Sequence, residues 1–503
     1  FTAVTSTGIY CRPVCRVKLP RRENCRFFRH AAQAEAEGFR PCLRCRPELA
    51  PRAASWSTED ASRILALQAA RLIDEPDAWA ADGPGAAQIA ARLGVSDRHL
   101  RRIFEAQFGV SPLQYLQTRR LLAAKQLIAD TRLPMTQVAL ASGFASVRRF
   151  NAAFLEHYGL NPSALRRAGG AEGGEGKAIE VRLGFRPPYD VNAMLGFFAR
   201  RALRGVEVAF TADSKEPAKG STPTYVRLAR TLRVQQGAQT HAGWLQLRFD
   251  MEREQMLLSV SDSLAAVLPI VISRARAMLD LDAEPMAINA ALHEAFPHGD
   301  GLRVPGTVDG FELAVRAVLG QQITVAAART LGSRLVAAFG EPIATPIEGL
   351  NRLFPTPAAV AAASGDALGQ LGIVRQRQAA LQAIAGEVAA GKLALHAGAD
   401  VPSTIAALQE LPGIGAWTAQ YIAMRALRWP DAFPAGDIAL QKALGVTTAR
   451  AASEASQAWR PWRSYAVLRA WHAPSPSSAT APAAESPAAE PSSSNIATAG
   501  ASA

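Results

Sequence analysis

Three patterns of apolar residues follow one another along the chain. Between residues 53 and 167 apolar positions recur with helical spacing, beginning with the amphipathic stretch Ala61–Asp74. Residues 178–265 alternate apolar and polar positions, which predicts strands, together with one helix at Ala193–Arg204. Residues 266–472 return to helical spacing with many short breaks at Gly and Pro. The predicted strands are Ala178–Leu183, Val206–Phe210, Thr224–Leu232, Gly243–Phe249 and Gln255–Val260.

Three segments lack such a pattern. Residues 1–52 are rich in Arg and Cys. Residues 168–177 (AGGAEGGEGK) have the composition of a flexible linker. From residue 473 to 503 nearly every residue is Ala, Ser, Pro, Thr or Glu, so little can be buried and we expect a disordered tail.

Composition and charge favour a folded protein with a polyanionic partner. The 503 residues are 49% hydrophobic and 19% charged, which excludes a chain that is disordered throughout. The formal net charge of +12 favours nucleic acid as the partner, although it does not require one. Because the sequence holds no run of about 18 uncharged apolar residues, we expect no membrane span.

All five cysteines lie between Cys11 and Cys45, which predicts a single local metal site in a reducing, cytoplasmic environment. Cys11 and Cys15 form one tight pair and Cys42 and Cys45 another, an arrangement that suits tetrahedral zinc. The spacing by itself favours a structural site that only holds a small domain together. Cys25 is left over as a thiol outside the ligand set.

Three strings around these cysteines closely resemble a known family. They are TSTGIYCRPVCR (residues 5–16), REN (22–24) and GFRPCLRC (38–45), and they resemble the N-terminal domain of the Ada family of adaptive-response regulators. The resemblance implies that Cys11 takes a methyl group from a methylphosphotriester in DNA. It also implies that Cys15, Cys42 and Cys45 stay zinc ligands together with Cys11.

Two helix-turn-helix patterns follow in the helical region. In the first, Gly94 makes the turn and Ser96 precedes a helix with Leu100, Ile103 and Phe104 on one face. In the second, Gly143 makes the turn and Ser146 precedes a helix with Val147, Phe150 and Phe154 on one face. One such pattern is as typical of an ordinary helical hairpin, but two with Arg-rich second helices favour DNA binding. The expected DNA-binding residues are Arg98, Arg101, Arg102, Arg148, Arg149 and Asn151.

The run GFASVRRFNAAFLEHYGLNPSALRR (residues 143–167) resembles the AraC-type DNA-binding domain. This resemblance implies that both recognition helices dock in successive major grooves of promoter DNA. Since a linker follows, we expect these helices to form a module separate from the rest of the chain.

A Gly hairpin and a carboxylate mark the last helical region. Backbone N–H groups of Gly413 and Gly415, in the sequence LPGIG, can hold a phosphate, although any tight turn has this composition. Asp437 follows in PAGD and has two interpretations, a helix cap or a catalytic carboxylate.

Four strings favour the catalytic interpretation. FRPPYDVNAMLGFFARRA (185–202), RVPGTVDGFELAVRAVLGQQITVAAA (303–328), LPGIGAWTAQYIAMRAL (411–427) and WRPWRSYAVLRAW (459–471) resemble the AlkA-type 3-methyladenine DNA glycosylases. The resemblance implies that Asp437 is catalytic and that Trp417, Tyr421 and Trp471 surround the base, where core packing is the alternative for each Trp. A leucine wedge expected near Gln322 is replaced by glutamine, and Ile323 is another candidate for that role.

The resemblance also bears on the type of reaction and on further ligands. Glycosylases of this superfamily that nick the strand carry a lysine where this chain has Trp417, so we expect base release without nicking. One zinc ion is expected, and a monovalent cation at the hairpin is a further expectation.

The combined interpretation is a regulator of the adaptive response fused to a glycosylase that releases alkylated purines. The alternative is a non-enzymatic transcription factor with structural zinc and a decayed glycosylase body that only binds DNA. Expected partners are damaged and promoter double-stranded DNA and RNA polymerase, with a monomeric protein associated with the nucleoid in a bacterial-type cytoplasm.

The expected fold is multidomain, mainly α with one α+β domain. Its parts are a small zinc domain at 1–52, a connecting helix and linker at 53–83, a paired helix-turn-helix domain at 84–167, a linker at 168–177, a mixed α/β domain at 178–265, a helix-hairpin-helix glycosylase body at 266–472, and a tail at 473–503.

Overall fold

The computed structural model describes residues 1–12, 15, 20–43, 47, 61–75, 86–168, 178–212 and 224–472. Four sequence-based expectations fall mainly outside these residues: Cys45 as a ligand, the connecting segments near 53–60 and 76–83, the linker at 169–177 and the tail at 473–503. Among the helices that are described, none has the length and apolar character needed to cross a bilayer.

The N-terminal part is a small sheet with one short helix. Strands β1 (Thr2–Val4), β2 (Ile9–Cys11), β3 (Cys25–Phe27) and β4 (Arg40–Pro41) form a sheet of order β3-β1-β2-β4. Helix α1 (Ala31–Ala36) packs on it through a core that, among the residues described, has the four buried side chains of Ala3, Tyr10, Ala34 and Phe39. So small a core stabilises little by itself, which fits a domain that depends on a metal.

In the described residues of the next part there are seven helices, and the two predicted helix-turn-helix patterns lie among them. The helices are α2 (Ala61–Asp74), α3 (Ala86–Arg92), α4 (Asp97–Phe108), α5 (Pro112–Asp130), α6 (Met135–Ala141), α7 (Val147–Tyr158) and α8 (Pro162–Ala168). Ser96 caps α4 and Ser146 caps α7, each accepting a bond from the backbone N–H three residues on. Gly94 and Gly143 have positive φ, as the turns require.

A five-stranded antiparallel sheet follows, with the order β5-β9-β8-β7-β6. Its members are β5 (Ala178–Gly184), β6 (Glu207–Thr211), β7 (Tyr225–Gln236), β8 (Gln239–Asp250) and β9 (Gln255–Ser261). All five predicted strands are therefore present. The predicted helix is α9 (Val191–Arg201). It starts earlier than expected because the Asp190 side chain caps it by accepting from the Ala193 N–H, and it also ends earlier than expected.

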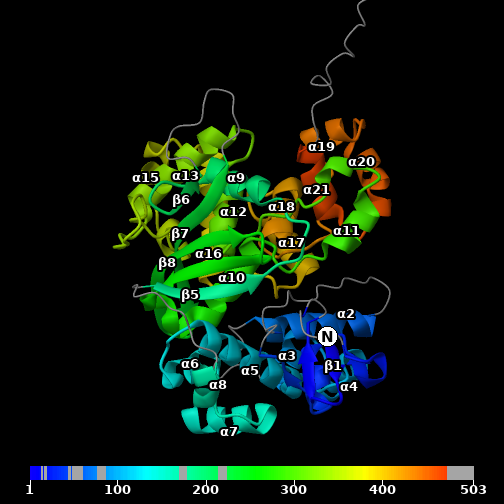
Figure 1. Cartoon of the computed structure of the whole chain (residues 1–503). Helices are drawn as coiled ribbons and strands as arrows, with labels where there is room; N and C mark the ends of the chain where they lie inside the picture. The colour runs from blue at the N-terminus through cyan, green and yellow to red at the C-terminus, as the bar shows by residue number, and fades with distance from the viewer. Residues whose placement is uncertain are drawn as a thin grey trace, which may run out of the picture.

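The remainder is helical around two apolar clusters (Figure 1). One cluster includes residues of α12, α16 and α18, and the other residues of α18, α19 and α21. The elements are η4 (Asp262–Val267), α10 (Leu268–Met278), α11 (Pro285–Leu292), η5 (Pro297–Gly299), α12 (Gly310–Leu319), α13 (Val325–Phe339), α14 (Pro357–Ala361), α15 (Gly365–Gln370), α16 (Arg375–Ala389), α17 (Val401–Glu410), α18 (Ala416–Arg425), α19 (Ile438–Ala443), α20 (Ala449–Ala455), η6 (Gln457–Trp459) and α21 (Arg463–His472).

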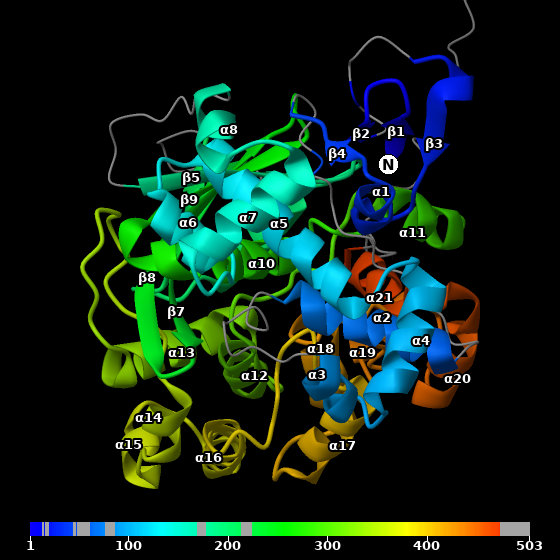
Figure 2. The same cartoon turned by 90° about the horizontal axis from the view of Figure 1, so that it is seen from below.

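The helix-turn-helix part is packed against the sheet rather than held apart from it (Figures 1 and 2). Leu127 and Ile128 of α5 share one apolar cluster with Val181 of β5. The Gln126 amide donates to the Arg182 carbonyl at 2.9 Å, and the Arg182 N–H donates to Asp130 at 3.3 Å. In the structure the helix-turn-helix helices thus contact the sheet domain, because apolar side chains of β5 are buried against α5 and those of η4 against α6.

Candidate functional site

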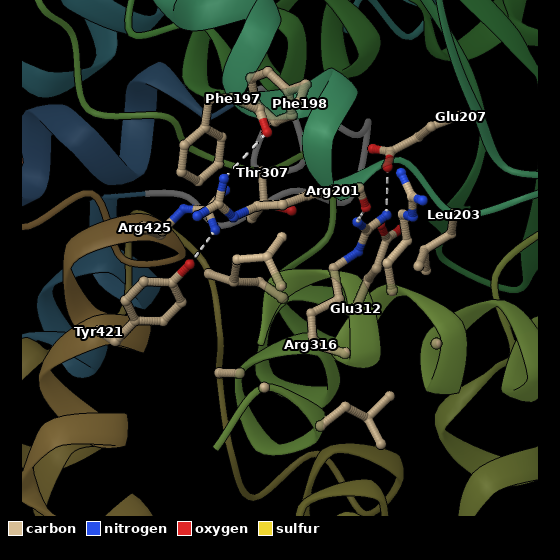
Figure 3. Close-up of a pocket in the computed structure, with 18 of the residues that line it drawn as sticks. Phe197, Phe198, Arg201, Leu203, Glu207, Thr307, Glu312, Arg316, Tyr421 and Arg425 are labelled. Carbon is tan, nitrogen blue, oxygen red and sulfur yellow. Dashed lines mark hydrogen bonds and ion pairs between the residues drawn. The ribbon is translucent and has the colours of Figure 1, made fainter. Parts of the chain in front are cut away.

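A pocket of about 270 Å³ lies where the sheet domain meets the helical body. Its lining includes Trp417, Tyr421, Asp437 and Trp471, which were expected to act together, and the structure brings all four to one place. Figure 3 shows Tyr421 and Arg425 on one side of the pocket and Glu312 and Arg316 on the other. This volume is near the lower end for ligand pockets, about 300–1,000 Å³, and suits a small planar group.

Asp437 caps a helix, as one of the two interpretations of its sequence context predicted, and it also lines the pocket. Its Oδ1 accepts from the Leu440 N–H at 2.7 Å and so caps α19. The indole N–H of Trp417 donates to Oδ2 at 2.7 Å, and that of Trp471 donates to Oδ1 at 3.1 Å. Three uncharged donors thus fix the carboxylate in the pocket wall and hold its charge in one place.

The aromatic side chains form a layered wall. Trp417 and Tyr421, one turn apart on α18, are stacked with ring centroids 5.1 Å apart and planes 10° apart. Trp471 of α21 lies 6.4 Å from Tyr421 at 43°. A base inserted between two rings needs roughly 7 Å, twice a van der Waals contact. In this conformation the Trp417–Tyr421 stack therefore leaves no room for a base between its two rings.

Three pocket residues were missed by sequence reasoning. Arg425 donates to the Tyr421 hydroxyl at 2.6 Å, and its guanidinium lies 4.6 Å from the centre of the Phe197 ring. Arg201 lies 3.8 Å from the same ring. Burial tends to raise the pKa of Tyr421, but Arg425 and Arg201 outweigh it and lower that pKa below its ordinary value. Phe197 and Arg201 belong to the segment 185–202, which resembles the glycosylases, but no neighbouring residue in the sequence indicates that they face Tyr421.

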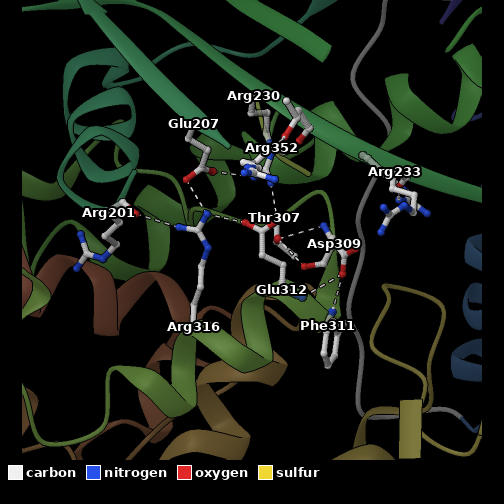
Figure 4. Close-up of polar contacts among 12 residues, drawn as sticks. Arg201, Glu207, Arg230, Arg233, Thr307, Asp309, Phe311, Glu312, Arg316 and Arg352 are labelled. Atoms are coloured by element: carbon white, nitrogen blue, oxygen red, sulfur yellow. Dashed lines mark hydrogen bonds and ion pairs between the residues drawn. The ribbon is translucent and has the colours of Figure 1, made fainter. Parts of the chain in front are cut away.

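A closed ring of ion pairs forms the floor of the pocket (Figure 4). Arg230 bridges Glu207 at 2.7 Å and Glu312 at 2.6 Å, and Arg316 bridges the same two carboxylates at 2.7 and 2.6 Å. Burial alone would raise the pKa of Glu312, but Arg230 and Arg316 hold it below its usual value. The ring ties β6 and β7 of the sheet domain to α12 of the helical body and thereby fixes the two walls of the pocket.

The Gly hairpin joins α17 to α18 beside the pocket. Gly413 has φ +75°, and an added Cβ would meet the Ala380 side chain at 3.3 Å, so the position requires glycine. Gly415 is the exposed N-cap of α18. The Gln321 amide donates to the Gly413 carbonyl at 2.9 Å and to the Thr418 hydroxyl at 3.0 Å, which anchors the neighbouring loop to the hairpin.

The two candidates for a wedge differ in their surroundings. Gln322 is exposed and has φ +54°, a left-handed conformation that is uncommon outside glycine. Ile323 is half-buried, lines the pocket and packs against the apolar cluster of α12, α16 and α18. Gln322 is therefore the one of the two whose side chain projects into solvent beside the pocket.

The N-terminal cysteines converge as the spacing predicts. The sulfur atoms of Cys11, Cys15 and Cys42 lie within 4.8 Å of one another. Zn–S bonds of about 2.3 Å in a tetrahedron put sulfurs roughly 3.8 Å apart, so the three thiols fit zinc after small shifts. Cys25 is outside this cluster, and its thiol donates to the Arg21 carbonyl at 3.4 Å.

The expected DNA-contacting side chains of both helix-turn-helix motifs are exposed. They are Arg98, Arg101 and Arg102 on α4 and Arg148, Arg149 and Asn151 on α7. Arg101 pairs with Asp97 at 2.9 Å within its own helix, a surface contact that contributes little to stability. Nothing in the described structure covers these faces.

A buried carboxylate joins the cysteine domain to these helices. Glu35 of α1 accepts a 2.8 Å bond from the hydroxyl of Tyr10, the residue before Cys11, and its other oxygen lies 3.9 Å from His157 of α7. Burial raises the pKa of Glu35 to about 7, against opposing effects of Tyr10, Thr118 and Lys125. Burial also lowers the pKa of His157, so the two side chains do not form an ion pair at neutral pH.

Glu35→Gln is expected to stabilise this contact at alkaline pH. The folded pKa of Glu35 exceeds the ordinary value of 4.5, so its stabilising contribution is complete below about pH 4.5 and is lost as pH rises through about 7. Glutamine cannot ionise. The variant should therefore keep the free energy of unfolding, on the order of 3 kcal/mol, that the unsubstituted protein loses between about pH 4.5 and pH 8. The free energy of unfolding of the zinc-loaded chain in denaturant measures it.

The control is Glu37→Gln, because Glu37 is on the same segment but exposed and paired with Arg26. That variant should follow the pH dependence of the unsubstituted protein. If Glu35→Gln shifts stability equally at both ends of the pH range, ionisation of Glu35 is not responsible.

Four family models match successive parts of the chain. They are the metal binding domain of Ada at residues 1–48, a helix-turn-helix domain at 89–168, the AlkA N-terminal domain at 180–309, and the HhH-GPD superfamily base excision DNA repair protein at 315–458. The pocket lies between the last two of these, and the cysteine cluster lies in the first.

Curated relatives match the whole chain or one part of it. The probable bifunctional transcriptional activator/DNA repair enzyme AlkA of Mycobacterium tuberculosis is 37% identical over 483 residues, 93% of this chain and 92% of the relative. DNA-3-methyladenine glycosylase 2 of Escherichia coli is 36% identical over 291 residues, 58% of this chain and 96% of its own length. The bifunctional transcriptional activator/DNA repair enzyme Ada of Escherichia coli is 30% identical over 181 residues, 36% of this chain and 46% of its own length.

Because one relative matches the metal-binding, helix-turn-helix and glycosylase parts together, the chain belongs to the family of bifunctional transcriptional activators and DNA repair enzymes that join an Ada-type regulator to an AlkA-type glycosylase.

Proposed function

We propose that the glycosylase part hydrolyses the N-glycosidic bond of alkylated purines of the 3-methyladenine and 7-methylguanine type. The observation that carries this proposal is the Asp437 carboxylate, held by two indole N–H groups at one end of an aromatic pocket. A relative named DNA-3-methyladenine glycosylase supports the class of substrate.

The reaction follows from charge. Alkylation at N3 or N7 makes the purine cationic, so its bond to C1′ breaks with the electron pair going to the base. Aromatic faces attract a cationic base by about 0.5–2 kcal/mol each, which offsets part of the few kcal/mol needed to extrude the nucleotide. Asp437 stabilises the positive sugar while water adds to C1′, and the proton of that water leaves to the carboxylate or to solvent.

The pocket arginines favour early departure of the base. Arg425 and Arg201 line the side of the pocket next to Tyr421, while Asp437 lies on the wall shared with Trp417 and Trp471. The positive charge is on the base at first and moves to the sugar as the bond breaks. Guanidinium groups near the base and a carboxylate near the sugar both favour this redistribution.

The released product should be an intact abasic strand. Trp417 occupies the position at which strand-nicking members of the superfamily carry a lysine, so no amine there can attack C1′. Purified protein with methylated duplex should give strand breaks on a denaturing gel only after heat or alkali. Borohydride should trap no covalent protein–DNA adduct, and a trapped adduct would show that another amine acts as the nucleophile.

We propose further that the N-terminal domain repairs DNA methylphosphotriesters irreversibly. Bound zinc would keep the cysteine thiols deprotonated at neutral pH. The Cys11 sulfur attacks the methyl carbon, an S–C bond forms, and the C–O bond breaks with its electrons left on the phosphate oxygen. A thioether is uncharged, so the four-thiolate set loses one negative charge and repels DNA less.

The choice of Cys11 over the other ligands rests on the family resemblance. Cys11 is 9% exposed and Cys42 is 7% exposed, so accessibility does not separate them. Support comes from the metal-binding match at residues 1–48 and from the Tyr10–Glu35 contact, which joins the residue beside Cys11 to a carboxylate that lies next to His157 of the helix-turn-helix part.

Three further expectations belong to the same proposal. The exposed arginines of α4 and α7 would bind promoter DNA, in line with the names of two relatives as transcriptional activators, and RNA polymerase is an expected partner. A monovalent cation at the hairpin and a monomeric state remain predictions. A methylpurine-release assay separates this proposal from the alternative of a decayed body, since a protein that only binds DNA releases no base.

A further inference from the structure

Another cavity, a groove of about 800 Å³, is lined by residues of β6 and α13 and does not include the aromatic side chains of the base pocket. Four arginines line it: Arg204, Arg329, Arg334 and Arg352. The rest of the lining includes the small polar side chains of Thr330, Ser333 and Asn351. The groove is open to solvent along α13, where Arg329 and Arg334 are exposed.

The groove has an excess of positive charge that its own walls do not neutralise. Arg334 and Arg352 donate to the backbone carbonyls of Leu371 (3.1 Å) and Gly340 (3.3 Å), not to carboxylates. Within the described part of the chain no ion pair involves Arg204 or Arg329. Glu207 is the acidic side chain of the lining, and both of its oxygens already bind Arg230 and Arg316.

The walls of the groove are held rigidly. The Gly205 carbonyl accepts from the backbone N–H groups of both Asn351 (3.0 Å) and Arg352 (2.9 Å). A Cβ on Gly205, which has φ +85°, would lie 3.0 Å from the Arg352 side chain, so glycine allows this close approach. Thr231 donates to the Arg352 carbonyl at 2.6 Å. The arginines are therefore presented on a fixed surface rather than on a free loop.

The groove continues from the base pocket. Arg329 and Glu207 line both cavities, and α13 starts directly after the loop that carries Gln322. A nucleotide in the pocket leaves the neighbouring phosphates of its strand near the pocket mouth. Four unneutralised guanidinium groups along that path match a row of phosphodiesters in charge and in hydrogen-bonding geometry.

We propose that this groove binds the phosphodiester backbone of the DNA that flanks the extruded nucleotide. The inference rests on the proposed glycosylase function and assigns a second DNA contact beyond the hairpin. Binding there is independent of sequence, because phosphates carry no base information. It would strengthen capture of duplex DNA without acting on the bond that breaks.

The test is the double variant Arg204→Gln/Arg334→Gln, in which glutamine still offers an N–H to the Leu371 carbonyl. The matched control Arg248→Gln/Arg253→Gln removes the same charge from exposed positions outside both cavities. All proteins carry Arg101→Ala and Arg148→Ala, so that the helix-turn-helix part contributes little to DNA binding. Excision from a duplex with one alkylated purine is measured over a series of salt concentrations.

The groove variant should raise KM several-fold at unchanged kcat, and its plot of log KM against log salt should be shallower by about 1 for each phosphate that the groove no longer binds. The control variant should match the parent. A groove variant that matches the control in KM and in slope overturns the inference. If the parent releases no base, the glycosylase proposal fails. The groove is then tested by binding to a duplex with an abasic-site analogue, and the salt dependence of the affinity is compared between the parent and the groove variant.

Competition by inorganic phosphate is the second measurement. If phosphate ions compete with DNA for the parent protein no better than chloride does at equal ionic strength, the groove needs a polymer of phosphates, as proposed. If phosphate binds tightly and the DNA slopes of parent and groove variant are equal, the groove is a site for a small anion and the inference is wrong.

Discussion

Asp437→Asn is expected to lower the rate of base release about 10²–10³-fold, the usual effect of removing one electrostatic group that stabilises a transition state. The substitution keeps the shape of the side chain and removes its charge. Single-turnover release of methylated purines from duplex DNA is the measurement, with binding to undamaged duplex as a check that the protein still docks.

The structure shows what else this substitution changes. Asparagine caps helices as well as aspartate does, so the bond from the Leu440 N–H to Oδ1 can persist. The new amide NH₂ would, however, face the Trp417 indole N–H, which now donates to Oδ2 at 2.7 Å. Two opposed donors cost about 1–3 kcal/mol of stability, which a thermal melt will show as a lower Tm.

Two variants separate charge from this side effect. Trp417→Phe in the Asp437→Asn background removes the opposed N–H, and excision should stay low if the charge is what matters. Asp400→Asn changes a capping aspartate of α17 that accepts from the Ser403 N–H and does not line the pocket, so its activity should be unchanged. Recovery of activity in the double variant would show that the opposed donors, and not the missing charge, cause the loss in Asp437→Asn.

Cys11→Ser should abolish methyl transfer from methylphosphotriester DNA, because a serine hydroxyl is neither ionised nor strongly nucleophilic at neutral pH. In the unsubstituted protein one methyl group should appear on the peptide that contains Cys11 and on no other cysteine. Peptide mass mapping after exposure to the DNA is the measurement, and the affinity for DNA should rise once the methyl group has been transferred.

Cys25→Ser is the matched control, since Cys25 is close in sequence but lies outside the cluster of Cys11, Cys15 and Cys42. It should accept methyl normally and keep its zinc. Cys42→Ser should lose the metal and much of the fold of residues 1–48, because four buried core side chains cannot hold that domain together. Methyl on Cys15, Cys42 or Cys45 with Cys11 untouched would contradict the assignment of the acceptor.

Most helices and strands could be predicted from the sequence, because the interactions that form them are local. The stripe of Leu100, Ile103 and Phe104 and the caps at Ser96 and Ser146 depend on residues within one or two turns. The alternation in β5 and β9 likewise shows in the sequence. Local signals can also mislead. Helix α9 ends three residues before the predicted end, and the sequence did not indicate this because no strong helix breaker directly follows Arg201.

Candidate site residues that lie close together in the sequence could be predicted for the same reason. Two Cys pairs each fit within one turn of chain, so their spacing alone predicts that three or four sulfurs can meet. Asp437 at the start of α19 was visible as a cap, and only its resemblance to a family suggested catalysis. Its two indole donors come from positions 20 residues before it and 34 residues after it.

What the sequence determined by itself were the types of element, the metal-ligand spacing, the capping residues and the family. The tertiary structure decided the rest: the Phe197, Arg201 and Arg425 side of the pocket, the ring of Glu207, Arg230, Glu312 and Arg316, the groove along α13, and the packing of α5 against β5. Helix and strand formation depends on neighbours a few residues apart, whereas these features depend on which distant surfaces bury each other's apolar area and satisfy each other's charges. A single sequence records the first directly, and only the folded chain brings together the residues that settle the second.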